Sequence, residues 1–342
     1  MTRTLATAAA LALLASRAGS TVPAAALPQI VQTYLDRQVK LDAAARERLL
    51  AGQPVTKLLD ADPSVEVAVF GAVWIAAPVD RYLAAVRDIE RFESGGSFRV
   101  TKKISSPPRL DDFAQLTIPK EDVEDLRSCK VARCELKLAE SAIERMRREI
   151  QWNKPDTTEQ VNRLARQIAL EYVTGYLHGG NAELAVYRDS ERPTFVAQEF
   201  TSLVNRLPEL GTAMAEVRRY LLEFPKVTLP NSESFLYWQE ANFGLKPTLR
   251  INHLMMSRHG DSAIIASKML YASHYFWTAL ELRALVVDPE RGPGFWFVTE
   301  SRSRSDGLSG FVGRILRGKV RGETEKGTAA VLQLTKKTME QK

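Results

Sequence analysis

The sequence predicts an α+β fold in which an antiparallel sheet packs against one long C-terminal helix. Three observations support this class. Stretches rich in β-branched and aromatic residues occur at 64–75 and again through 233–302, where turn residues separate them. Between these regions, residues 139–224 carry apolar residues at helical spacing. An amphipathic pattern over 306–340 predicts the last helix.

These patterns divide the chain into five segments. They are a signal peptide (1–26), an N-terminal helical segment (27–63), the first part of a sheet domain (64–138), a helical insertion (139–232), and the second part of the sheet domain with its C-terminal helix (233–342). The 342 residues, 45% of them hydrophobic and 26% charged, suffice for one large or two small globular domains.

The N-terminus has the features of an export signal. Arg3 precedes an apolar run from Leu5 to Ala15, and small-x-small cleavage sites follow at 16–18 and 24–26. The run is shorter than the roughly 20 residues that span a bilayer. No cysteine follows it, so a lipoprotein is not expected. We therefore predict a periplasmic or secreted bacterial protein; the alternative is an apolar N-terminal helix of a cytosolic protein.

The two cysteines, Cys129 and Cys134, are the only ones in the chain. Zinc normally needs more thiolates or partnering histidines, and the four histidines show no ligand spacing. In an oxidising compartment the pair predicts a disulfide that closes a tight loop. The alternative is two free, buried thiols. We expect no metal and no cofactor.

The first sheet segment begins with a strand at 64–75 and a helix at 77–92, which Pro78 starts. Further strands are predicted at 96–104, 112–118 and 134–138. After the insertion, five closely spaced strands predict an antiparallel meander. They cover 233–244, 248–258, 262–277, 279–288 and 294–302. Because their alternation is imperfect, we expect both faces of the sheet to be covered.

A basic stretch at 302–321 precedes and enters the C-terminal helix. Its apolar residues recur at helical spacing, and Ser305 or Asp306 is a plausible N-cap. Arg314, Arg317 and Arg321 fall on the opposite face, which we expect to be solvated. The alternative is contact with anionic phospholipid headgroups. Export argues against binding to nucleic acid.

The order of elements resembles the START-like, or helix-grip, superfamily, which includes polyketide cyclase-like proteins. The resemblance rests on "VEVAVFGAVWIAAPVDRYLAAVRDIERF", "YASHYFWTALELRALVVD" and "SRSRSDGLSGFVGRILRGKVR". It implies a curved antiparallel sheet wrapped around the C-terminal helix, with an apolar cavity between them. It covers about half of the chain by element order. Residues 28–60 and 125–230 have no counterpart in the minimal fold.

The resemblance implies a carrier or sensor that binds a lipid or other apolar small molecule without chemistry. The expected cavity holds about 300 Å³ or more. Its predicted ligand-binding residues are Trp238, Ile251, His253, Met255, Tyr271, Arg283, Phe297, Phe311 and Ile315. His253 or Arg283 would orient a polar group, although each of these residues also fits a role in the core or in a structural hydrogen bond or ion pair.

Enzyme function is the alternative within the same fold. The chain contains no G-x-S-x-G, H-E-x-x-H, P-loop or G-x-G-x-x-G motif. His253 near Glu240 or Glu281 would make a general-base pair in a cyclase- or hydrolase-like enzyme. A third possibility is an envelope interaction protein with a filled core. No catalytic residue is assigned.

Overall fold

The computed structural model describes residues 27–208, 211–242, 246–306 and 310–341, with backbone alone for 310–317. The elements, of which η1 is a π-helix and η2 and η3 are 3₁₀-helices, are α1 (Gln29–Tyr34), η1 (Leu35–Val39), α2 (Ala43–Leu50), β1 (Val55–Leu58), β2 (Glu66–Ile75), α3 (Val79–Arg87), α4 (Ile89–Phe92), β3 (Phe98–Lys103), η2 (Leu110–Phe113), α5 (Lys120–Ser128), α6 (Glu140–Glu149), α7 (Thr157–Gly179), η3 (Gly180–Glu183), β4 (Val186–Tyr187), β5 (Thr194–Phe195), α8 (Val196–Val204), α9 (Gly211–Glu223), β6 (Ser232–Ala241), β7 (Thr248–His259), β8 (Ser262–Ala272), β9 (Phe276–Val287), β10 (Phe295–Ser305) and α10 (Gly310–Glu340). The predicted signal peptide lies outside the described residues.

One antiparallel sheet of eight strands organises the molecule, in the order β1-β2-β10-β9-β8-β7-β6-β3. The meander β6 to β10 pairs each strand with the next, as the turn signals predicted. The two parts of the chain interleave, because β2 pairs with β10 and β3 pairs with β6. The predicted α+β class, with a large antiparallel sheet and a C-terminal helix, is confirmed.

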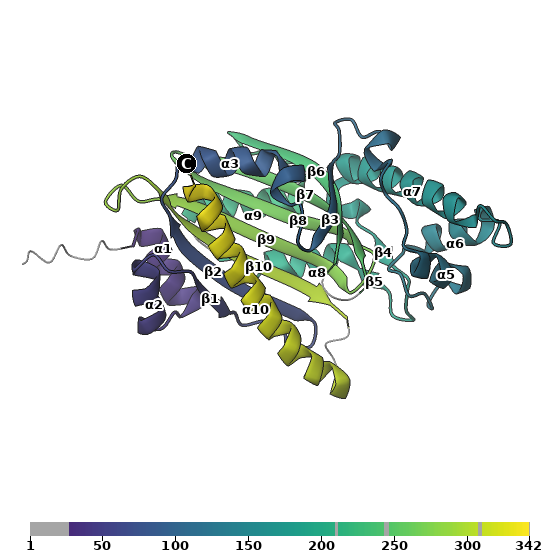
Figure 1. The fold of residues 1–342 in the computed structure, drawn as a ribbon, viewed down its shortest axis with the longest axis horizontal. Coiled ribbons are helices and arrows are strands. Elements are labelled where there is room, and N and C mark those ends of the chain that lie inside the picture. The colour runs from purple at the N-terminus through teal and green to yellow at the C-terminus, as the bar shows by residue number, and fades with distance from the viewer. Residues whose placement is uncertain (1–26, 209–210, 243–245, 307–309, 342) are drawn as a thin grey trace, which may run out of the picture.

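The face of the sheet that carries α3, α4 and α10 is called the front face (Figure 1). Its core joins Val73 and Phe297, which are paired across β2 and β10, to Tyr82 of α3 and Leu332 of α10. Gly71 of β2 allows α10 to lie this close, because a Cβ there would stand 2.9 Å from the Leu332 Cδ1 atom.

The opposite, back face carries three groups of helices. The helices α1, η1 and α2 pack on β2 and β10. The helices α8 and α9 pack on the middle strands, and α7 packs on β6 and β7. The helices α5, α6 and α7 also share a small core of their own. Both faces of the sheet are therefore covered, as the strand pattern predicted.

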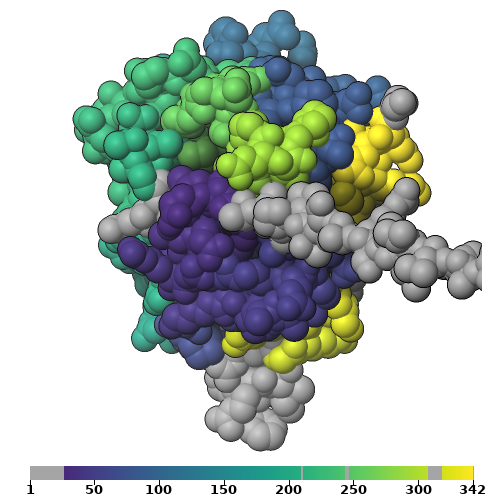
Figure 2. Space-filling model, turned by 90° about the vertical axis from the view of Figure 1, so that its left-hand side faces the viewer, coloured from purple at the N-terminus to yellow at the C-terminus, as the bar shows by residue number. Residues whose placement is uncertain are grey.

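The N-terminal helices lie against the turn between β9 and β10, which Figure 2 shows in purple and light green. Arg291 of that turn donates from Nη2 to the Leu50 carbonyl oxygen at 2.7 Å. Its guanidinium also lies over the rings of Trp74 and Trp296, at 5.1 and 4.6 Å from their centroids. This contact joins α2 to the turn between β9 and β10.

Several predicted elements differ from the structure. Residues 112–118 form the end of η2 and a turn, because the Asp112 carboxylate accepts from the backbone amides of Ser105 and Arg109. Residues 134–138 form no strand, since their backbone bonds go to loops, as from the Lys137 amide to the Ser273 carbonyl. The strand β1 and the helix α5 were not predicted; β1 lies in the segment that was predicted to be helical.

The predicted disulfide between Cys129 and Cys134 is present in the structure. Cys129 caps the C-terminus of α5, and the loop between the two cysteines is tied to a second loop by the bond from the Cys134 amide to the Asp189 carbonyl. The bridge therefore fixes the end of α5 near the loop that contains Asp189, which belongs to the helical insertion.

We expect the double variant Cys129→Ser/Cys134→Ser to lose about 2 kcal/mol of unfolding free energy, the loop-closure value for so short a loop. Urea titration, with and without reductant, measures it. Reductant should lower the stability of the native chain by a similar amount and leave the double variant unchanged. Equal stability of the two proteins in oxidising buffer would contradict the prediction.

Candidate functional site

An apolar cavity of about 110 Å³ lies between the back face of the sheet and the helices α5, α6 and α7. We call it the back-face cavity. Its lining is mostly aliphatic and aromatic, with a few polar side chains among them. The lining residues are Thr117, Ile118, Pro119, Asp122, Leu126, Leu136, Leu138, Ala139, Ala142, Met146, Ala165, Ile168, Ala169, Tyr172, Ala185, Trp238, Glu240, Pro247, Leu249, Ile251, Tyr271 and Ser273.

Two periodicities of the sequence build its walls. In β6 and β7, residues two apart share a face, so Trp238 and its cross-strand partner Ile251 both point to the back. Tyr271 of β8 stands opposite Ile251. The roof comes from α7, whose lining residues recur at helical offsets of three, four and seven. They are Ala165, Ile168, Ala169 and Tyr172. Small alanines at two of these positions leave room beneath the helix.

The polar tips of two lining aromatic residues, Trp238 and Tyr172, are bonded to backbone. Trp238 Nε1 donates to the Asp112 carbonyl at 2.8 Å, and the Tyr172 hydroxyl donates to the Leu270 carbonyl at 2.7 Å. Burial raises the pKa of Tyr172 and of Tyr271, so both phenols stay protonated. Their rings thus present apolar surface to the cavity.

One buried acid–base pair stands at the cavity wall. The Asp122 carboxylate lies 3.0 Å from His274 Nε2, and both side chains are almost fully buried. Lys246 Nζ is 3.9 Å from the same carboxylate and 2.6 Å from Asp125. The hydrogen bond to Asp125 raises the pKa of Lys246, which keeps the ammonium charged. The charged residues of the lining are Asp122 and Glu240, both carboxylates.

The predicted ligand-binding residues fall at several places. Trp238, Ile251 and Tyr271 meet in the back-face cavity. His253 and Met255 lie on the same face, but under α7, α8 and α9. Arg283 and Phe297 lie on the front face. The side chains of Phe311 and Ile315, and those of Arg314 and Arg317, lie outside the described residues.

His253 belongs to a buried polar cluster. The Tyr176 hydroxyl is 2.9 Å from its Nδ1 and the Tyr220 hydroxyl 3.3 Å from its Nε2. Burial lowers the pKa of His253 to about 3, so the ring is neutral at physiological pH. Glu240 and Glu281, the acids considered as its partners, are elsewhere: Glu240 pairs with Arg99 and Glu281 with Arg283.

Arg283 is an internal ion-pair partner on the front face. It donates to Glu281 from Nε at 2.8 Å and from Nη2 at 2.9 Å. Glu93, which follows α4, lies 3.5 Å away. Arg283, Glu281 and Glu93 thus form one charged cluster that links the end of α4 to the sheet. The back-face cavity therefore lies on the opposite face of the sheet from the predicted cavity, whose lining side chains from α10, Phe311 and Ile315, lie outside the described residues.

The predicted site did not include the wall from α5, whereas α6 lies in the segment that was predicted to be a helical insertion. A signal was present: Pro119 followed by acidic residues at 121 and 122 is typical of a helix start.

Within the described part of the chain, no three His, Cys, Asp or Glu residues are grouped as a metal site. No helix there has the length and apolarity to cross a membrane. Neither a protein-family model nor a curated protein sequence matches the chain.

Proposed function

We propose that this protein binds a lipid or another apolar small molecule in the back-face cavity, as a carrier or sensor without chemistry. The observation that carries the proposal is an apolar space inside the fold, lined by aromatic and aliphatic residues from the sheet and from three helices. Such concave apolar sites with a few polar groups are typical of small-molecule binding.

The cavity suggests the kind of ligand. A water-sized group needs roughly 10–15 Å³, so 110 Å³ accommodates about seven to eleven such groups. That matches an alkyl chain or the end of an acyl chain better than a large ring system. Because Asp122 and Glu240 are hydrogen-bond acceptors, a hydroxyl or other donor suits the polar end of the ligand.

We also propose a START-like, helix-grip relationship. It is supported by the order of β2, α3, the meander β6–β10 and a last helix, α10, that lies on β2. Lys336 of α10 donates to the Trp74 carbonyl at 2.7 Å, and Glu340 accepts from the Ala76 amide at 2.8 Å. The proposed ligand site differs from the family's, since it lies on the face of the sheet opposite to this helix.

Export to the bacterial periplasm completes the proposal. It is supported by the disulfide and by the order of charged, apolar and small residues in 1–26. Contact of Arg314, Arg317 and Arg321 with anionic headgroups, the alternative to a solvated face, is a weaker companion of this proposal. If this contact forms, liposome binding falls when the three arginines are replaced by glutamine.

Enzyme function is the second candidate, and the Asp122–His274 pair is the observation that favours it. A buried carboxylate held by an imidazole and facing an apolar cavity is an arrangement suited to general acid–base catalysis. The variant Asp122→Asn separates the two functions. A binder keeps its affinity for apolar chains, whereas an enzyme converts a bound ligand only when Asp122 is present.

We expect Ala165→Phe to weaken binding of 1-decanol at least tenfold, or about 1.4 kcal/mol, because the added ring occupies the space under α7. Isothermal titration calorimetry measures the affinity. The control is Ala44→Phe, the same change at an exposed position of α2. Ala142→Leu offers a smaller filling group should the larger one prevent folding. Equal affinity of all four proteins would overturn the proposed site.

A further inference from the structure

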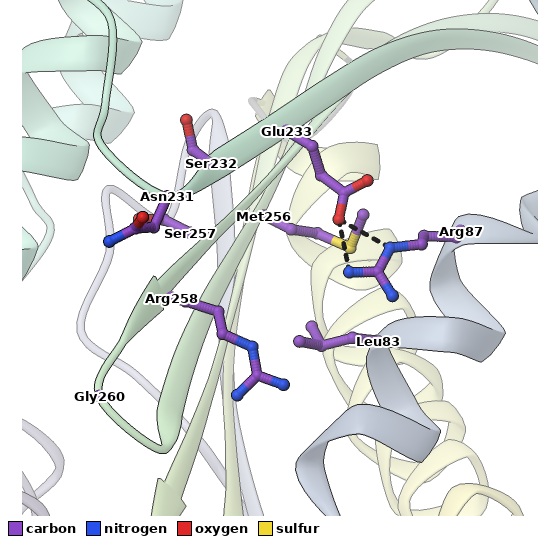
Figure 3. A pocket seen from close by; sticks show the side chains of 9 residues that line it. All are labelled: Leu83, Arg87, Asn231, Ser232, Glu233, Met256, Ser257, Arg258 and Gly260. Atoms are coloured by element: carbon purple, nitrogen blue, oxygen red, sulfur yellow. Dashed lines mark hydrogen bonds and ion pairs between the residues drawn. The ribbon is translucent and has the colours of Figure 1, made fainter.

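A second hollow, of about 520 Å³, lies at the edge of the front face (Figure 3). It is bounded by the C-terminal half of α3, the start of β6 and the end of β7 with its following turn. The lining residues are Leu83, Arg87, Asn231, Ser232, Glu233, Met256, Ser257, Arg258 and Gly260. Its volume falls within the usual range of small-molecule sites, about 300–1,000 Å³.

Two guanidinium groups reach this hollow from different elements. Figure 3 shows Arg87 entering from α3 and Arg258 from β7, with the Leu83 side chain near both. Arg87 bonds to Glu233 through Nε and Nη2, both 2.7 Å from Oε1. Arg258 bonds to Asp80, which is not part of the lining. Two positive and one negative side chain therefore line the hollow.

The carboxylates in these two ion pairs can be exchanged for another anion, because the pairs are largely exposed to solvent. The side chains of Arg87 and Glu233 are 46% and 47% exposed, and that of Asp80 is 77% exposed. Exposed pairs contribute little, since water solvates both partners well. Guanidinium groups bind the oxygens of phosphate or carboxylate in bidentate geometry. An anion between the two arginines can therefore replace carboxylates that are free to turn into solvent.

The floor of the hollow is apolar. Leu83 and Met256 form it, and both belong to the front-face core. Methionine adapts its shape to irregular apolar groups. Polar side chains surround this floor, since Ser232 and Asn231 stand on one side and the arginines on the other. A ligand that fits has a charged head and a short apolar group beside it.

We propose that this hollow is a second binding site, for an anionic amphiphile whose phosphate or carboxylate head lies between Arg87 and Arg258. Its apolar part lies on Leu83 and Met256. The site is separate from the back-face cavity, because the two lie on opposite faces of the sheet and share no lining residue. The inference thus does not depend on the proposed function.

Titration with monomeric octyl phosphate tests the site. We expect Arg87→Gln/Arg258→Gln to weaken its binding at least tenfold. Arg147→Gln/Arg148→Gln, which removes the same charge from exposed positions of α6, should bind like the native chain. Inorganic phosphate should bind at least tenfold more weakly than octyl phosphate, because it lacks the apolar group.

Two further arms complete the test. Ala165→Phe should leave octyl phosphate binding unchanged, which separates this site from the back-face cavity. Cosedimentation with phosphatidic acid vesicles identifies the source of the anionic head group. Cosedimentation that depends on Arg87 and Arg258 indicates a lipid head group in a bilayer. Binding of octyl phosphate without cosedimentation indicates a free amphiphile. Octyl phosphate affinity that is the same in both double variants overturns the proposal, as does equal affinity for inorganic phosphate.

Discussion

The variant Glu66→Ala is expected to lose about 3 kcal/mol of unfolding free energy, near the lower end of the cost of breaking a buried ion pair. The Glu66 side chain is fully buried at the back of β2. Its carboxylate accepts from Arg302 Nη1 at 2.8 Å and from Arg304 Nη1 at 3.3 Å, both on the neighbouring strand β10. Alanine would leave two arginines short of an acceptor.

The loss stays near the lower end because the arginines keep other partners. Arg302 also donates to Glu300, and Arg304 donates to Glu199 of α8 at 2.6 Å. Glu300 in turn accepts from the Tyr34 hydroxyl of α1. Burial raises the pKa of Tyr34, so its phenol remains a donor. The network thereby joins α1, β2, β10 and α8.

Urea titration of Glu66→Ala against the native chain measures the loss. Glu47→Ala, at an exposed position of α2, is the matched control and should change stability by less than about 0.5 kcal/mol. Glu66→Gln keeps the shape and two hydrogen-bonding atoms but not the charge. A loss for Glu66→Ala no larger than that of the control would show that the arginines are satisfied without Glu66.

This network explains why the basic stretch could be interpreted only in part. From the sequence, Arg302 and Arg304 belong to a positively charged run whose acids are few. In the fold they belong to β10, and their partners Glu66 and Glu199 are more than one hundred residues away. Local spacing shows where charges gather, but it holds no information about acids brought in by strand pairing.

The elements that could be predicted are those whose pattern is long and regular. The five strands of the meander and α10 are of this kind, and each is found close to its predicted range. The elements that differ are short: β1 has four residues and α5 nine. In such short segments, side-chain bonds such as those of Asp112 decide the backbone path.

The candidate site, too, could be predicted from the sequence only in part. Trp238, Ile251 and Tyr271 were predicted as ligand-binding residues and lie together in the back-face cavity. The strand pattern does not say which helix covers which face of the sheet. His253 and Ile251 share the back face, yet one lies under Tyr176 and Tyr220 and the other lines a cavity. The difference comes from α7 and α9, whose packing the strand sequence does not encode.

The variant Lys268→Met is expected to be more stable than the native chain by about 1–3 kcal/mol at pH 7, because folding of the native chain must either bury the lysine charge or remove its proton. Lys268 lies on the back of β8 and is only 1% exposed. Its Nζ donates to the Asn181 side-chain oxygen and lies 3.4 Å from the Tyr176 hydroxyl. It also lies over the Phe200 ring at 4.2 Å from the centroid.

The lowered pKa of Lys268 predicts how the stability difference between the two proteins changes with pH. Burial lowers the pKa of Lys268 well below its ordinary 10.5. Between the lowered value and 10.5, the unfolded chain binds a proton that the folded chain does not, so this residue makes stability rise with pH. Methionine cannot take up the proton, and the stability advantage of Lys268→Met should therefore shrink as pH rises from 7 to 9.

Urea titrations of both proteins at several pH values between 7 and 9 measure the effect, and the difference between them removes the contribution of the buried tyrosines. Lys154→Met, at an exposed position between α6 and α7, is the matched control and should show a small, constant difference. If Lys268→Met proves less stable than the native chain at pH 7, the bonds to Asn181 and Tyr176 outweigh the cost of burial. A difference that does not change with pH would mean that Lys268 keeps its ordinary pKa in the folded chain.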